Sequence, residues 1–383
     1  MSISTPARNI PLARPSIGIE EENAVLDALR SGWISQGPRV AEFEQKFAAY
    51  VGAQYAVAVS SCTTALHLAL VVAGIGPGDE VICPSLSFIA TANAIVYARA
   101  RPIFADIDPA TYNIDPASIE RAITSRTRGI LLVHQVGLPA ALDEIAQIAG
   151  KHGLVVVEDA ACAIGAEYHQ KRIGLPHSTM ACFSFHPRKI LTTGEGGMIT
   201  TADEGLANHL RRLRQHGMSV SDHARHGSKE VVVESYDEVG YNYRMTDIQA
   251  ALGMVQLRRL EGIINRRRYM AHRYAERLTS ISWIKPPYEP VGLRHNYQSY
   301  MARLSPDAPI SRDELMQVLL DQGISTRRGI MPIHREAPYR GDWDRLLPVT
   351  NAVTDSAIIL PLFHEMTEDD QDYVIECVEL AGR

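Results

Sequence analysis

The sequence predicts an α/β protein in which a mostly parallel sheet is covered by helices on both faces and a smaller α/β domain follows. Short apolar runs alternate with helical patterns up to about residue 216, and repeated strand–helix–strand units form parallel sheets of this kind. A long helical pattern then begins at Met245, after which strands and helices alternate again. We therefore expect two domains, residues 1–245 and residues 246–383.

The individual elements follow from hydrophobic periodicity. Short apolar or β-branched runs predict strands, and apolar residues at helical spacing predict helices. The first strand-to-helix turn carries no G-x-G-x-x-G sequence, which argues against a dinucleotide-binding domain. The expected strands are 55–59, 80–83, 102–106, 129–134, 154–158, 180–185, 198–201 and 300–304. The expected helices are 20–29, 40–50, 65–70, 90–97, 141–152, 245–274, 312–322 and 367–379.

Composition and charge are those of a soluble globular protein. The 383 residues are 46% hydrophobic and 21% charged, and the formal net charge of −6 gives no reason to expect nucleic-acid or membrane binding. The N-terminus lacks an apolar signal-peptide core, so a cytoplasmic location is expected. The five cysteines are an odd number without a C-x-x-C pair, which indicates reduced thiols and no metal site.

One lysine has an unusual setting. Lys189 lies between a strand-like run that ends at Phe185 and a glycine-rich turn at residues 194–197, and Ser184 lies five residues before it. A lysine in a loop is usually only solvated. This position, however, can present the amine to a cofactor aldehyde, so Lys189 is interpreted as a Schiff-base lysine.

A carboxylate in the predicted sheet complements this lysine. Asp159 follows the buried run at residues 154–158, and the carboxyl ends of parallel strands line the crevice where α/β proteins bind ligands. The alternative is a simple helix N-cap. Pyridoxal phosphate needs such a pair of residues, since the lysine bonds its aldehyde and the carboxylate keeps its ring nitrogen protonated.

A third element is suited to the phosphate of that cofactor. Small hydroxyl residues at 60–64 join the strand at 55–59 to the helix at 65–70. Free backbone N–H groups at a helix N-terminus bind phosphate, although Ser and Thr are also the commonest helix caps. Ser184 offers another hydroxyl close to Lys189.

Together these motifs resemble the DegT/DnrJ/StrS family of pyridoxal-phosphate-dependent nucleotide-sugar aminotransferases, which have fold type I. The resemblance extends from Pro11 to the final helix, and its motifs occur in the family's order. The matching segments are SGWISQGP at 31–38, FE at 43–44, SSCTTAL at 60–66, GPGDEV at 76–81, PSLSF at 84–88, EDAA at 158–161, FSFHPRK at 183–189, TTGEGG at 192–197, GYNYRM at 240–245 and PIH at 332–334.

The resemblance implies a role for each matching residue. Lys189 bonds the cofactor and then moves a proton, and Asp159 pairs with the ring nitrogen. Phe88 stacks on the ring, and His186 lies near the reacting sugar. The family builds its sites across a homodimer interface. The implied phosphate ligands are Thr63, Thr64, Ser184 and, toward the neighbouring subunit's cofactor, Asn242.

The substrate is indicated less directly. The form of residues 186–197 looks more like family members that aminate carbon 4 of a nucleotide-linked 4-keto-6-deoxysugar than those acting at carbon 3 or on a cyclitol ketone. Glutamate is the expected donor, with ping-pong kinetics. Arg327, Arg328 and His334 are candidates for the nucleotide diphosphate or the donor carboxylate, although both arginines could simply be solvated.

Two other functions remain open at this point. A related sugar dehydratase uses the same cofactor but has histidine in place of the lysine, and Lys189 is present here. A non-catalytic regulator that binds the cofactor is the other alternative, which the pair of Lys189 and Asp159 makes improbable. We also expect burial and a cationic ring to lower the pKa of Lys189.

Two residues depart from the family pattern. Cys62 replaces a common glycine and Cys162 replaces a common glutamine; the second change removes an amide that family members can place near the cofactor. The segment 219–237 breaks the regular pattern and is expected to be either a loop over the active site or an arm across the dimer.

Overall fold

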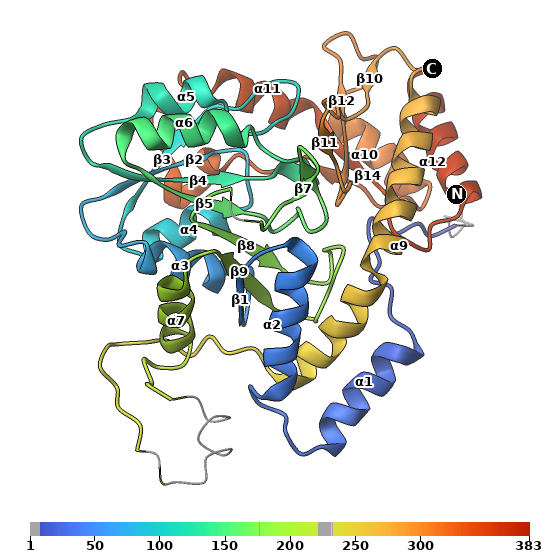
Figure 1. The fold of residues 1–383 in the computed structure, drawn as a ribbon. Helices are drawn as coiled ribbons and strands as arrows, with labels where there is room; N and C mark the ends of the chain where they lie inside the picture. Colours follow the sequence, from blue (N-terminus) through green and yellow to red (C-terminus); the bar gives the residue numbers. More distant parts are fainter. Residues whose placement is uncertain (1–7, 176, 221–230, 232) are drawn as a thin grey trace.

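The computed structural model describes residues 8–175, 177–220, 231 and 233–383. Its centre is a seven-stranded sheet of order β1-β9-β8-β5-β4-β2-β3 (Figure 1). Only β9 runs antiparallel to its neighbours, so the predicted mostly parallel sheet is confirmed. The strands are β1 (Tyr55–Val59), β2 (Glu80–Pro84), β3 (Arg101–Ala105), β4 (Thr127–Val133), β5 (Val155–Asp159), β8 (Met180–Ser184) and β9 (Gly197–Thr201).

Helices cover both faces of this sheet. Successive side chains of a strand point to opposite faces, and both faces of these strands carry apolar residues that the helices bury. In β1, Ala56 and Ala58 belong to one buried cluster while Val57 and Val59 belong to another. The first cluster includes α2 (Pro38–Val51), α5 (Pro116–Ala122) and α6 (Leu142–His152). The second includes α3 (Cys62–Val72), α4 (Ala90–Tyr97) and α7 (Glu204–Leu213).

A long helix connects this core to a second one. α9 (Asp247–Leu278) begins at a capping box in which the Thr246 side chain accepts from the Gln249 N–H. Its first half packs in the core of the large sheet and beside α1 (Ile19–Arg30), and its second half packs in the core of a four-stranded sheet. That sheet consists of β10 (Ile284–Lys285), β12 (Tyr300–Leu304), β14 (Ala357–Leu360) and β13 (Arg327–Arg328), packed with α10 (Arg312–Asp321) and α12 (Glu368–Ala381).

Several contacts cross the boundary expected at residue 245. β11 (Leu293–Arg294) pairs with β6 (Glu167–Tyr168), which pairs with β7 (Lys171–Arg172). Ile333 and Leu347 pack in the core of the large sheet, so the chain returns there before α11 (Pro348–Ser356). The two-domain boundary stays a prediction, and α9 belongs to both cores.

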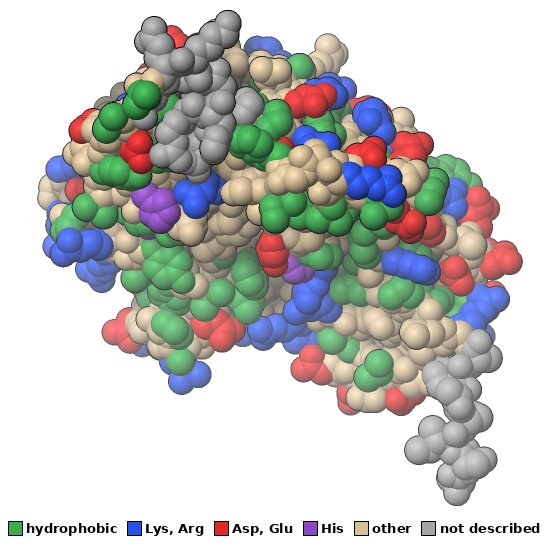
Figure 2. Space-filling model, turned by 90° about the horizontal axis from the view of Figure 1, so that it is seen from below, with side chains coloured by type: hydrophobic (Ala, Val, Ile, Leu, Met, Phe, Trp, Pro, Cys, Tyr) green, Lys and Arg blue, Asp and Glu red, His purple; other side chains and the backbone are tan. Residues whose placement is uncertain are grey.

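Of the segment predicted as a loop or arm, residues 221–230 and 232 lie outside the described residues. Every helix in the described ranges is too short or too polar to span a bilayer. Figure 2 shows acidic and basic side chains mixed over one face, without a wide patch of one sign.

Candidate active site

Asp159 is the last residue of β5, and its carboxylate is buried at the carboxyl ends of the parallel strands. One carboxylate oxygen, Oδ2, accepts from Thr91 Oγ1 at 2.8 Å, and Oδ1 accepts from the Ala161 N–H at 3.1 Å. Burial raises the pKa of Asp159, while these two hydrogen bonds and the charge of Lys189 act in the opposite direction. No helix follows β5, so Asp159 is not the helix N-cap that its sequence position also allowed.

Lys189 lies in the loop after β8. Because β8 runs parallel to β5, this loop is at the same end of the strands as Asp159. Its backbone N–H donates to the His186 carbonyl at 2.8 Å, and its Nζ donates to Cys162 Sγ at 3.1 Å. Burial alone lowers the pKa of the Lys189 amine, but Cys162, Asp159 and Cys62 together raise it above its ordinary value. The lowering expected beside a cationic cofactor ring stays a prediction, because these groups belong to the protein alone.

The N-terminus of α3 lies against the start of β9. Gly197 pairs with Ser184 across the two strands, and a Cβ at Gly197 would lie 2.5 Å from the Ser61 carbonyl oxygen. Only glycine allows this approach. The close contact brings the start of β9 against the turn that holds Thr63 and Thr64, while Ser184 Oγ accepts from the His186 N–H at 3.4 Å.

The helix-cap alternative for this turn is also present. Ser61 Oγ accepts from the Thr64 N–H at 3.2 Å, and Thr64 Oγ1 donates to the Ser61 carbonyl at 2.8 Å. The Thr64 hydroxyl is thus engaged in the cap of α3. Thr63 is half-buried in the first turn. Phosphate binding by these residues stays a prediction.

Three further predicted residues are exposed or half-buried. The Phe88 side chain is 68% exposed, in the turn before α4. Asn242 is exposed and bridges to Gln215 through the backbone. His186 is half-buried, and its Nδ1 accepts from the Arg188 N–H at 3.2 Å. Burial, followed by the charges of Arg188 and Lys189, lowers the pKa of His186 against the effect of Glu195, so its ring is mainly neutral at pH 7.

The predicted substrate residues divide into two groups. Arg327 and Arg328 are exposed on β13. Arg328 pairs with Glu336 at 3.6 Å. Burial and then the charges of Arg188 and Arg328 lower the pKa of Arg327, so these two arginines both lie within electrostatic reach of Arg327. The three form an arginine cluster suited to a polyanion.

His334, by contrast, is buried with protein partners on both ring nitrogens. Its Nδ1 lies 2.7 Å from Ser85 Oγ, and its Nε2 lies 3.2 Å from Asp344 Oδ1 and 3.1 Å from Asn351 Oδ1. A substrate contact by His334 stays a prediction, whereas its structural role is visible.

The sequence reasoning missed the residues that orient Asp159. Thr91, in the first turn of α4, donates to that carboxylate, and its Oγ1 lies 2.8 Å from Ser87 Oγ in the preceding turn, so α4 and the turn before it support the end of β5. Ser87 precedes the helix, so no helical spacing relates the two hydroxyls and the sequence offers no signal for this pair.

We expect Thr91→Val to weaken catalysis through Asp159. The substitution removes a hydrogen bond that favours the ionised carboxylate, so the pKa of Asp159 rises further and the acid limb of the kcat/KM profile moves to higher pH. Near neutral pH, kcat/KM should fall roughly tenfold, the lower range for a hydrogen bond to a charged group. A pH–rate profile matching that of the wild type would contradict this role, and Thr91→Ser should restore it.

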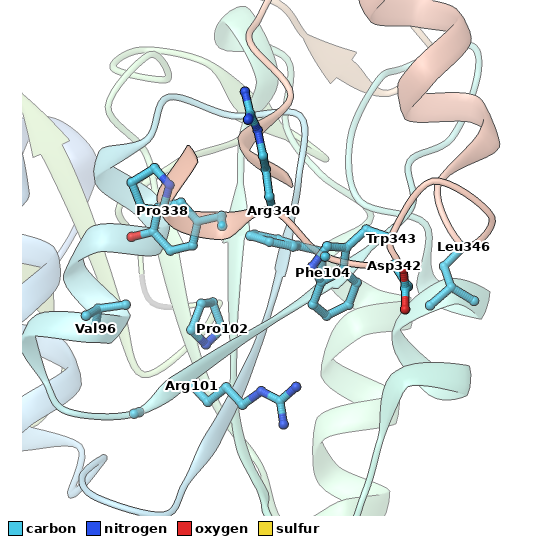
Figure 3. A pocket seen from close by; sticks show the side chains of 12 residues that line it. Val96, Arg101, Pro102, Phe104, Pro338, Arg340, Asp342, Trp343 and Leu346 are labelled. Carbon is cyan, nitrogen blue, oxygen red and sulfur yellow. The ribbon is translucent and has the colours of Figure 1, made fainter. Parts of the chain in front are cut away.

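A separate cavity of about 640 Å³ lies along the edge strand β3 (Figure 3). Phe104, Tyr339 and Trp343 line it, and their rings pack edge to face. Neither Lys189 nor Asp159 is among its lining residues. We therefore assign the chemistry to the carboxyl ends of the parallel strands, where Asp159 and Lys189 lie, and not to this cavity.

The groups around Asp159 fit the ring of pyridoxal phosphate. Its buried carboxylate receives a hydroxyl and an amide N–H, and no ion pair joins it to another side chain within the described ranges. A protonated ring nitrogen would supply the missing positive charge. An α/β fold with a lysine amine and this carboxylate at the carboxyl ends of its parallel strands is the arrangement expected of a fold type I pyridoxal-phosphate enzyme.

Comparison with known proteins gives the family. Residues 15–379 match the model of the DegT/DnrJ/EryC1/StrS aminotransferase family, so the chain belongs to that family. It is 42% identical over 374 residues to the spore coat polysaccharide biosynthesis protein SpsC of Bacillus subtilis, covering 96% of both chains. The prediction of a pyridoxal-phosphate-dependent sugar aminotransferase is confirmed at the level of the enzyme class.

Solved structures agree with this membership. A putative sugar aminotransferase of Streptococcus pneumoniae in its PLP form superposes with a TM-score of 0.91 at 30% identity, covering 98% of this chain and 99% of that one. The aminotransferase TlmJ of Streptoalloteichus hindustanus gives a TM-score of 0.88 at 34% identity, covering 97% and 98%. The predicted fold type is therefore confirmed.

Proposed function

We propose that this aminotransferase converts the ketone of a nucleotide-linked 4-keto-6-deoxysugar to an amine, with pyridoxal phosphate as cofactor and glutamate as donor, in a ping-pong reaction. The observation that carries the proposal is that the Lys189 amine and the buried Asp159 carboxylate both lie at the carboxyl ends of the parallel strands. The relatives named for sugar transamination and for polysaccharide biosynthesis support a sugar substrate.

Each residue then has a defined task. Pyridoxal phosphate, when bound, supplies an aldehyde and a ring that accepts electrons from the reacting carbon. Lys189 would hold that aldehyde through its amine, and the same amine would carry a proton to and from the reacting carbon. Asp159 keeps the ring nitrogen protonated, and the hydrogen bonds from Thr91 and Ala161 orient its carboxylate.

The remaining residues hold the two ends of the bound molecules. Phe88, with its exposed ring, stacks on the cofactor. Thr63, Thr64 and Ser184 bind the phosphate from one subunit, and Asn242 binds it from the other. The arginine cluster of Arg188, Arg327 and Arg328 offers positive charge to the nucleotide diphosphate, and His186 lies beside the sugar.

An absorbance titration tests this function. Glutamate should convert the yellow aldehyde-bound form of the cofactor to the aminated form, and one nucleotide-linked 4-ketosugar from a panel should restore the first spectrum. The panel should include 3-ketosugars and cyclitol ketones. Failure of every amino acid to change the spectrum would refute an aminotransferase, and preference for a 3-ketosugar or a cyclitol ketone would refute the proposed substrate.

We expect a homodimer with shared sites, because Asn242 lies far in sequence from the other phosphate candidates. Lys189→Ala and Asn242→Asp subunits, each inactive alone, should regain up to half the wild-type activity per heterodimer when mixed. One site then carries both defects and the other carries neither. No recovery, or a fully active monomer, would contradict the shared site; the Asn242→Asp variant must first be shown to be impaired on its own.

A further inference from the structure

Gln298, far along the chain from the proposed chemistry, holds the loop that carries Lys189. Its side-chain Nε2 donates at 2.9 Å to the Arg188 carbonyl, which belongs to the peptide bond leading into Lys189. Among the described residues, the other hydrogen bonds to the backbone of residues 186–189 all come from within residues 184–189. In that part of the chain, Gln298 is therefore the residue that ties the backbone of this loop to the rest of the protein.

Asn296, two residues earlier, holds the turn that follows Asp159. Its Nδ2 donates to the carbonyls of Cys162 and Ile164, each at 2.8 Å. Its Oδ1 accepts from the backbone N–H of Gln298 at 2.9 Å, which joins the two contacts. The same short stretch of chain therefore fixes the backbone next to the carboxylate and the backbone next to the amine.

The backbone between these two residues has an uncommon conformation. Tyr297 has a φ of 50°, in the left-handed region that few side chains of this size adopt. The buried guanidinium of Arg267, on α9, donates to the carbonyls of Tyr297 and Gln298 at 3.0 and 2.6 Å and stabilises the turn. Conformations of this kind persist only where the surroundings hold them, and they gather at functional sites.

The two amide side chains are held in one place and one orientation. Gly137 has φ +102°, and a Cβ there would lie 1.7 Å from Asn296 Oδ1 and 3.1 Å from the Cys162 carbonyl oxygen. The Gln298 amide is bonded at its other end as well, because its Oε1 accepts from Ser299 Oγ at 3.0 Å. Its Nε2 therefore faces the loop.

We propose that Gln298 is a positioning residue for Lys189. Through the Arg188 carbonyl it fixes the point from which the amine reaches the cofactor aldehyde, and Asn296 keeps that point in register with Asp159. The inference rests on the proposed role of Lys189. Bond formation joins the lysine nitrogen to the aldehyde carbon and releases the aldehyde oxygen as water, so its rate depends on where the amine is held.

The rate of cofactor capture tests this role without measuring turnover. Cofactor-free protein is mixed with pyridoxal phosphate, samples are reduced with borohydride at intervals, and peptide mass spectrometry counts the labelled Lys189. Gln298→Met keeps the length of the side chain but removes the donor, so labelling should be roughly tenfold slower than in the wild type. Ser299→Ala is the matched control, because it removes the hydrogen bond at the other end of the same amide, and its labelling rate should be close to that of the wild type.

A second background separates positioning from general disruption. In Lys189→Ala, which cannot bond the aldehyde, Gln298→Met should leave the dissociation constant of pyridoxal phosphate unchanged. Weaker binding in that background would show that Gln298 merely supports the fold, and would overturn the proposal. If Gln298→Met melts early, Gln298→Asn replaces it, since asparagine retains the amide but is one methylene too short to reach the carbonyl.

Two results would overturn the role of Gln298 alone. These are equal labelling rates in the wild type and in a folded Gln298 variant, or an equal slowing in Ser299→Ala. A wild type in which Lys189 is never labelled would instead refute the proposed function, so the two failures are distinguishable.

Discussion

Lys189→Ala is expected to abolish transamination while leaving the fold intact. The substitution removes the covalent link to the cofactor and the group that moves the proton, and the second loss alone is worth 10²- to 10⁴-fold. We expect kcat to fall by at least about 10⁴-fold. Steady-state kinetics with glutamate and the ketosugar measure this effect.

The structure explains why the variant should remain folded. Among the described residues, the Lys189 side chain makes a single hydrogen bond, to Cys162, so its removal disrupts little of the surrounding structure. A circular dichroism spectrum and a melting temperature close to those of the wild type are the controls. Activity within tenfold of the wild type in a folded variant would refute the assignment of Lys189.

Asp159→Asn should give the second-largest effect. Asparagine has nearly the same shape and can still accept from Thr91, but it cannot stabilise a protonated ring nitrogen. The ring then loses much of its capacity to accept electrons, and kcat should fall by roughly 10³-fold or more while the cofactor still binds. The loss should far exceed that of Thr91→Val, which only perturbs the same carboxylate.

Stability provides an independent check on Asp159. Burial opposes ionisation of this carboxylate and raises its pKa, so replacing it with a neutral amide should not lower the melting temperature. A variant that melts at the wild-type temperature but turns over near the wild-type rate would show that Asp159 merely orders the turn at Ala161. A variant that no longer binds cofactor would point to a positioning role instead.

Most of the fold follows from local patterns in the sequence. The apolar runs that predict strands coincide with β1 to β5, β8 and β9 within two residues at their ends, because buried parallel strands are continuous apolar segments. The short pairings were not predictable. β6, β7 and β11 have two residues each, which is too few for a periodic pattern. β11 pairs with β6 across a long sequence separation that includes α9.

The candidate site divides in the same way. Lys189 and Asp159 could be predicted as site residues because each follows a predicted strand. The carboxyl ends of parallel strands lie together on one side of the sheet. Thr91 could not be predicted, because its partner lies 68 residues away along the chain. Cys162 could be named only as a departure from the family pattern, since its contact with Lys189 spans 27 residues. The raised pKa of Lys189 likewise depends on which sulfur faces the amine, and this was not visible in the sequence.

Borohydride trapping of the cofactor tests the central claim most directly. Protein incubated with pyridoxal phosphate is reduced, digested and mapped by mass spectrometry, which fixes the cofactor to the lysine that bonds it. The account predicts one phosphopyridoxyl group, on Lys189, and none at that position in Lys189→Arg. Stoichiometric labelling of a different lysine, with Lys189 unmodified, would contradict it.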